Sequence, residues 1–128
     1  MREILLVGMG GFIGSVLRFK IGSLALHSFG PRLPIGTLIV NLVGCFIIGY
    51  LTGLIEKRNL LNPEIRLLLI TGFLGGFTTF SAFGLDTLSL LRRARLPMAL
   101  LNVGVSVLGG LFMVWLGLKV AGALSSKL

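Results

Sequence analysis

The chain has 128 residues, of which 55% are hydrophobic and 12% are charged, against roughly 25% charged residues in ordinary soluble domains. A water-soluble fold of this length could not bury so much apolar surface, so the composition excludes an ordinary soluble domain. The net charge of +8 would suggest a nucleic-acid partner in a soluble protein, but the sequence has no recognition helix and no basic patch interleaved with aromatic residues. We therefore expect no nucleic-acid partner.

Four apolar segments appear when the sequence is divided at its charged residues and prolines. Each reaches the length of about 20 residues that a helix needs to cross roughly 30 Å of hydrocarbon. Backbone groups find no water in that layer, and continuous apolar runs without alternation indicate helices rather than barrel strands. We predict an all-α integral membrane protein, a single four-helix membrane domain over residues 1–128, with transmembrane helices at about 4–26, 35–55, 65–91 and 98–121.

The first segment contains Arg18 and Lys20, and no small-x-small cleavage sequence follows it, which favours a retained span over a cleaved signal peptide. Arg18 is also a candidate source of positive potential near one mouth of an ion route. Gly10 and Gly14 form a G-x-x-x-G pair, which permits close helix packing but does not identify the partner helix.

The second segment carries intramembrane polar residues on one face. Thr37 and Asn41 lie four residues apart, and Cys45 follows one turn later. A polar side chain in hydrocarbon is costly, so these residues are candidates for a transport route. The alternative is interhelical hydrogen bonding, worth roughly 1 kcal/mol, and the sequence of this segment alone does not separate the two interpretations. A second G-x-x-x-G pair, Gly49 and Gly53, follows.

The third segment contains the passage TGFLGGFTTFSAFG from Thr71 to Gly84, in which paired glycines precede two threonines and a serine. Such residues favour a continuous helix poorly, so we predict that the third helix is broken near its middle, between about Gly75 and Ser81. A break frees backbone groups, which is tolerable at membrane depth only where protein, water or a bound ion satisfies them. Freed carbonyls would suit a cation such as sodium, whereas amides and hydroxyls would suit an anion.

Two phenylalanines of this passage, Phe80 and Phe83, would project from roughly one face of a helix. The edges of aromatic rings carry partial positive charge and can receive an anion without the fixed opposite charge that would trap it. The alternative is ordinary apolar packing. The neighbouring Thr79 and Ser81, in a helix broken by glycines, favour the anion interpretation.

The fourth segment places Asn102 and Ser106 on one face, with Gly110 one turn further, which fits a short polar track and a packing seam equally well. Asp86, near the end of the third segment, is the only acidic residue of the predicted spans, whereas a proton-coupled exporter needs a carboxylate or histidine well inside the membrane. The sequence contains no phosphate loop, metal cluster or catalytic triad, so we do not expect an enzyme.

An even number of spans places both termini, and the loop between the second and third helices, on one side of the membrane. With the charged residues assigned in this way, lysines and arginines are balanced between the two ends of the predicted helices. That balance lacks the excess that normally fixes orientation. We therefore predict insertion in both orientations and an antiparallel, dual-topology homodimer; the alternative is that the arginines at 92, 93 and 95 dominate and fix one orientation. One end carries Arg2, Lys57, Arg58, Arg66, Lys119 and Lys127, and the other carries Arg32, Arg92, Arg93, Arg95 and, if they reach toward it, Arg18 and Lys20.

Over essentially its whole length, the chain resembles the Fluc-type fluoride channels of bacteria. The resemblance rests on GTLIVN from Gly36 to Asn41, on the passage from Thr71 to Phe83, and on Arg18 after a glycine-rich stretch. It implies a passive, fluoride-selective ion channel that exports cytoplasmic fluoride. It also implies a multi-pass protein of the bacterial inner membrane, with fluoride, the lipid bilayer and a second, antiparallel copy as partners.

The resemblance further implies roles for individual residues. Phe80 and Phe83 would coordinate fluoride, and Asn41 would be a pore amide required for conduction. The backbone carbonyls of Gly75 and Thr78 would hold a structural sodium ion at the dimer interface. The complete set expected along the fluoride pathway is Phe80, Phe83, Asn41, Ser81, Thr79, Thr37, Asn102, Ser106 and Arg18.

Two features keep other interpretations open. Some members of the family carry tyrosine and serine where this chain has Asn102 and Gly110, so the role of the track on the fourth helix is not fixed by the resemblance. A small dual-topology multidrug exporter and a nonconducting membrane scaffold subunit are the alternative functions. The exporter is disfavoured by the missing intramembrane carboxylate.

Overall fold

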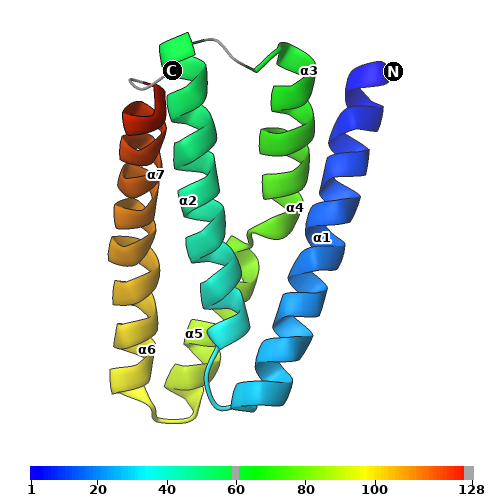
Figure 1. The fold of residues 1–128 in the computed structure, drawn as a ribbon. Coiled ribbons are helices and arrows are strands. Elements are labelled where there is room, and N and C mark those ends of the chain that lie inside the picture. The colour runs from blue at the N-terminus through cyan, green and yellow to red at the C-terminus, as the bar shows by residue number, and fades with distance from the viewer. Residues whose placement is uncertain (59–60, 126–128) are drawn as a thin grey trace.

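The computed structural model describes residues 1–58 and 61–125, and its regular structure over these ranges is entirely helical (Figure 1). Four stretches within them are long and apolar enough to span a membrane, which confirms the predicted all-α fold with four helices of spanning length. The elements in chain order are α1 (Arg2–Phe29), α2 (Ile35–Arg58), α3 (Pro63–Arg66), the π-helix η1 (Leu67–Leu74), α4 (Gly75–Phe77), α5 (Phe80–Arg92), α6 (Leu96–Gly104), the π-helix η2 (Val105–Gly109) and α7 (Gly110–Ser125).

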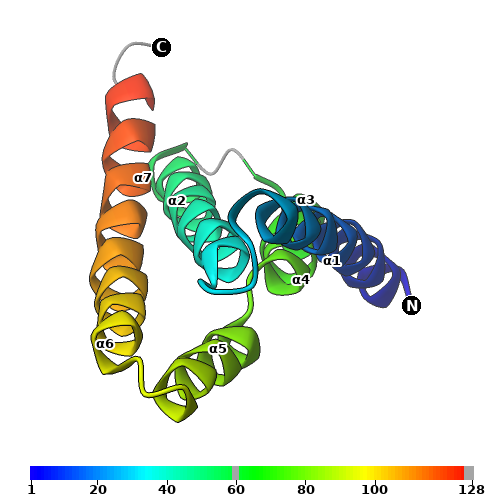
Figure 2. The same ribbon diagram turned by 90° about the horizontal axis from the view of Figure 1, so that it is seen from below.

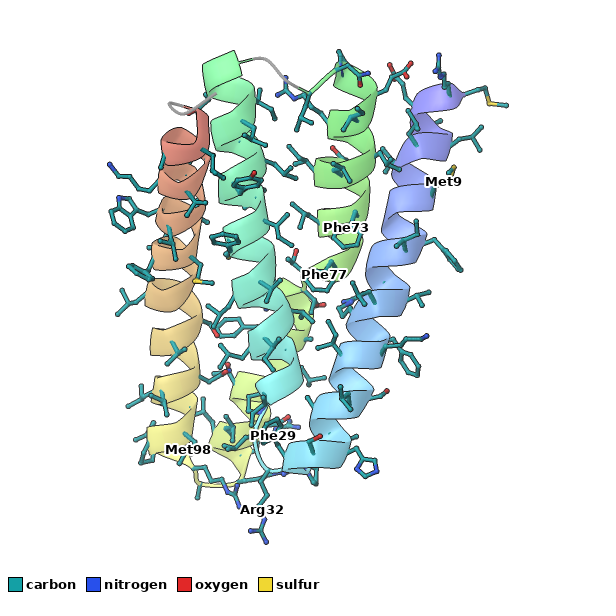
Figure 3. All side chains as sticks on the ribbon, in the orientation of Figure 1. Met9, Phe29, Arg32, Phe73, Phe77 and Met98 are labelled. Atoms are coloured by element: carbon teal, nitrogen blue, oxygen red, sulfur yellow. The ribbon has the colours of Figure 1, made fainter. Side chains whose placement is uncertain are left out.

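The four spans run up and down, so α7 ends at the end of the bundle where α1 begins (Figure 1). At the opposite end, Gly30 terminates α1 with φ of 73°, a left-handed conformation that glycine adopts without steric cost. Its amide donates to the carbonyl of Leu26 at 2.9 Å, and Arg32 follows in the loop before α2 (Figure 3). The helices begin and end within a few residues of the predicted bounds.

The third span is broken, as the sequence predicts, and the break lies at Thr78 and Thr79. Both residues are extended, with φ and ψ of −88° and 158° for Thr78 and −154° and 116° for Thr79. The half before the break packs along α1, whereas α5 lies against α6, so the two halves belong to different parts of the bundle (Figure 2). The break therefore lies at the seam between these parts.

Glycines bring the helices close together within the chain. A Cβ added at Gly14 would overlap the carbonyl oxygen of Phe73, and one at Gly10 would overlap that of Leu68. The G-x-x-x-G pair of α1 is thus used against the third span. In the same way, Gly49 and Gly53 of the second pair pack against α7, the first of them at the carbonyl of Val114.

A small apolar cluster fixes the broken span in the bundle. Val40, Leu74 and Phe77 are almost fully buried, and the rings of Phe73 and Phe77 stack with centroids 5.5 Å apart (Figure 3). Phe77 is the last residue of α4, so its buried ring anchors the chain directly before the break. Large apolar side chains elsewhere are widely exposed, as expected for helices that face lipid.

Candidate ion pathway

The side chain of Asn41 satisfies the backbone at the break. Its amide nitrogen donates to the carbonyl oxygen of Thr79 at 3.0 Å, and its amide oxygen accepts from the backbone N–H of the same residue at 2.8 Å. Asn41 lies in the first third of α2, 38 residues earlier in the sequence. One side chain thereby gives the N–H of Thr79 the acceptor that the break removes, and it adds a donor to the carbonyl of Thr79, which caps the start of α5.

The hydroxyl groups beside the break form a second set of contacts. The hydroxyl of Thr79 caps α5 by accepting from the N–H of Ala82 at 3.2 Å, and it lies 3.2 Å from the hydroxyl of Ser81. Thr78 donates its hydroxyl proton back to the carbonyl of Leu74 at 2.9 Å. The start of α5 therefore presents two adjacent hydroxyls, those of Thr79 and Ser81, which can reorient to donate or accept.

Because two backbone N–H groups bond to side chains at the break, two backbone carbonyls lack the donors that a continuous helix would give them. In a continuous helix, the N–H of Thr79 would bond to the carbonyl of Gly75, but it bonds to Asn41. Likewise, the N–H of Ala82 bonds to the hydroxyl of Thr79 and not to the carbonyl of Thr78. The oxygens of Gly75 and Thr78, which the family resemblance associates with sodium, thus lose the partners of a regular helix.

The rings of Phe80 and Phe83 form a tilted pair at the start of α5. Their centroids are 5.6 Å apart and their planes are inclined by 44°. The side chain of Phe80 is 84% exposed in the single chain, and Phe83 is partly buried. The pair therefore directs one ring toward the interior and one toward the open face of the molecule.

A groove of about 430 Å³ collects most of the predicted site residues. It lies between α2, the third span and the fourth span, and Cys45 and Leu74 also line it. Ser81, hydrogen-bonded to Thr79, is next to this lining. The predicted residues that line the groove are Asn41, Gly75, Thr78, Thr79, Phe80, Phe83 and Ser106.

Arg18 and Thr37 lie on the other side of the break from this groove. Both line a second cavity of about 330 Å³, to which Thr79 also contributes. Thr37 lines a third cavity as well, of about 340 Å³, that extends to Arg32 and Arg93 in the loops at that end of the bundle. Because neighbouring cavities share lining residues, the hollow surface continues from the break to the charged end of the bundle.

The structure assigns partners that the sequence did not indicate. The hydroxyl of Thr37 donates to the carboxylate of Asp86 at 2.7 Å and so links α2 to α5. The hydroxyl of Ser15 donates to the carbonyl of Gly76 at 3.4 Å. The sequence held one signal for the contact with Thr37. Asp86 is the only acidic residue of the predicted spans, and it lies one turn after Phe83.

Asn102 and Ser106 do not line the same surface. Ser106 lines the groove, whereas Asn102 is 8% exposed and donates its amide to the hydroxyl of Thr87 at 3.0 Å. The helix changes from α to π geometry at Val105, between the two residues, and the wider turn alters the register on which the predicted shared face depended.

The chain matches the model of a known family over residues 5–118, described as CrcB-like protein, Camphor Resistance (CrcB). It is similar to proteins named fluoride-specific ion channel FluC. Identity is 46% to that of Methylobacillus flagellatus over 120 residues, covering 93% of this chain and 94% of the relative. It is 50% to that of Rhizobium etli strain CIAT 652 over 126 residues, covering 98% and 93%. It is 45% to that of Chlorobium phaeobacteroides over 118 residues, covering 92% and 91%.

The double hydrogen bond at the break predicts a large loss of stability for Asn41→Ala. The N–H of Thr79 would lose its acceptor and the carbonyl would lose one of its donors, so the free energy of unfolding should fall by roughly 1–3 kcal/mol. Cys45→Ala, one turn later on α2 and lining the same groove, should cost about 1 kcal/mol or less. Unfolding in detergent, followed by circular dichroism at a fixed protein concentration, measures both. Equal losses for the two variants would show that Asn41 does not support the break.

Proposed function

The chain belongs to the CrcB-like protein family, and from that membership we propose that it is a passive, fluoride-selective ion channel. Relatives that cover almost the whole chain at 45–50% identity bear the name of a fluoride-specific ion channel and not that of an enzyme. The observation that carries the proposal is the groove at the break, which is lined by threonine and serine residues, by Asn41 and by two phenylalanines.

The chemistry of this groove suits fluoride. Fluoride is small, strongly hydrated and a strong hydrogen-bond acceptor, so a pathway must replace its water with donors and still release it. One proton of the Asn41 amide is used by Thr79, which leaves the second for an anion. The hydroxyls of Thr79 and Ser81 and the ring edges of Phe80 and Phe83 complete an uncharged set of donors.

Residues around the groove extend the proposed pathway. Ser106 faces the groove from the fourth span, and Arg18 supplies positive potential from the second cavity. Thr37 lines that cavity, and its hydroxyl donates to the carboxylate of Asp86. A passive route of this kind lets fluoride leave the cytoplasm down its own gradient across the bacterial inner membrane.

The open face of the single chain supports an antiparallel homodimer. Gly75 and Phe80 line the same open groove and are exposed, as is the neighbouring Ser81, and polar backbone and hydroxyl groups are costly against lipid. A second copy would cover this face. Because lysines and arginines are balanced between the two ends of the helices, the two copies can insert in opposite orientations.

A structural sodium ion fits the carbonyl oxygens that the break releases. Gly75 and Thr78 both line the groove, and their helical donors are engaged elsewhere. Carbonyl oxygens are suitable ligands for a hard cation of low charge. When bound, the ion would neutralise the partial negative charge of these carbonyls and help to hold the two copies together.

The channel hypothesis predicts selective, passive efflux. Liposomes that contain the purified protein and potassium fluoride should release fluoride rapidly when valinomycin is added to dissipate the voltage, and should hardly release chloride from matched potassium chloride liposomes. A fluoride electrode and a chloride electrode measure the two rates. Equal chloride release would refute selectivity, a strict need for a pH gradient would indicate an exporter, and no release of either ion would indicate a scaffold.

The ring-edge hypothesis predicts that Phe80→Ile and Phe83→Ile each reduce fluoride efflux by at least about tenfold, equivalent to roughly 1.4 kcal/mol in the barrier. Isoleucine keeps apolar volume but has no positive ring edge. Phe112→Ile is the matched control, because Phe112 forms a similar tilted pair with Trp115, 5.7 Å apart on α7, and should leave efflux unchanged. If the groove variants lose the dimer on gel filtration, the rings serve packing instead.

A further inference from the structure

Asn102 is the polar side chain of α6, and it does not line the groove. It is the one buried polar side chain among the residues for which burial is described, with 8% of its surface exposed. Burial of an amide is unfavourable unless it is hydrogen-bonded. The partner here is the hydroxyl of Thr87 on α5, 3.0 Å from the Asn102 amide nitrogen.

The direction of this hydrogen bond follows from the number of protons available. The hydroxyl of Thr87 has a single proton, which it donates to the backbone carbonyl of Phe83 at 2.8 Å. Thr87 must therefore accept from Asn102, and the amide nitrogen must be the donor. The result is a directed chain from the Asn102 amide, through the Thr87 hydroxyl, to the backbone of Phe83.

This chain acts on a helix with few other attachments. α5 is a 13-residue helix that follows an extended linkage and packs mainly against α6, away from α1 (Figure 2). Its other polar links are at Thr79, to Asn41, and at Asp86, to Thr37. Thr87 lies on the side that faces α6, so its bond to Asn102 opposes rotation of α5 about its own axis.

We propose that Asn102 is a positioning residue for the Phe80 and Phe83 rings, which it holds in their groove-facing orientation through Thr87, and that it does not itself contact the transported ion. The proposal rests on the proposed channel function for its consequence in transport. Asn102 is absent from the lining of all the cavities described above, whereas Ser106, one turn later, lines the groove. Rotation of α5 would move both rings together, because they lie on the same short helix.

The test is a double-mutant cycle with two readouts. Asn102→Ala and Thr87→Val each break the chain of hydrogen bonds, and the double variant breaks it no further. Thr87→Ser keeps the hydroxyl that Thr87→Val removes. Val103→Ala, at an exposed position of α6, is the control. The first readout is fluoride efflux from liposomes. The second is the ¹⁹F NMR resonance of 4-fluorophenylalanine placed at position 83. It is compared only among variants that have the same oligomeric state as the wild-type protein.

We expect Asn102→Ala and Thr87→Val to reduce efflux by a similar factor, roughly 5- to 30-fold, as for the loss of one to two kcal/mol. The double variant should be no slower than either single variant, Thr87→Ser should be close to wild type, and both single variants should shift the ¹⁹F resonance in the same direction. Multiplicative losses in the double variant, or slower efflux for Asn102→Ala with an unchanged resonance, would overturn the proposal.

Two further outcomes are decisive. If Asn102→Ala does not fold, Thr87→Val against Thr87→Ser still tests the hydroxyl, and equal behaviour of these two variants would overturn the proposal. If the wild-type protein passes no fluoride, the channel function fails, but the ¹⁹F resonance remains informative. A shift shared by Asn102→Ala and Thr87→Val would then support the link to Phe83, and no shift would refute it.

Discussion

The structure depends on the requirement that backbone polar groups be satisfied where no water is available. The break at Thr78 and Thr79 places that requirement in the middle of a membrane span. Asn41 meets it by giving Thr79 both an acceptor and a donor from a neighbouring helix. Once Thr79 is held in this way, the carbonyls of Gly75 and Thr78 lose their helical partners, and the hydroxyls of Thr79 and Ser81 gather at the start of α5.

Close packing elsewhere leaves the break at a seam between two parts of the chain. The glycines of α1 bring it against the first half of the third span, and the glycines of α2 bring it against α7. α5 belongs to neither contact and is positioned by hydrogen bonds from Asn41, Thr37 and Asn102. The proposed fluoride groove forms at this seam, where these hydrogen bonds and the packing of α5 against α6 hold the second half of the third span.

The sequence predicted the parts of this arrangement that depend on local properties. Long apolar runs indicated the spans, and glycines followed by threonines indicated the break, because both signals act within one segment. The bond from Asn41 to Thr79 joins residues 38 positions apart and could not be derived from either segment alone. Asn102 and Ser106 were expected on one face by α-helical spacing, but the π-helix η2 begins between them and changes the register. The link from Thr37 to Asp86 likewise required the packing of α5.

We propose that an inverted second copy covers the open face beside Phe80, and the proposed pathway depends on this arrangement. It can be tested with Ser28→Cys in a Cys45→Ala background, which places one thiol at an exposed position near the end of α1 and leaves every lysine and arginine in place. Labelling of intact cells with a membrane-impermeant maleimide should modify about half of the protein, and permeabilisation should allow the remainder to react, because the balanced charges permit both orientations. Labelling of all or none of the protein before permeabilisation would contradict the claim.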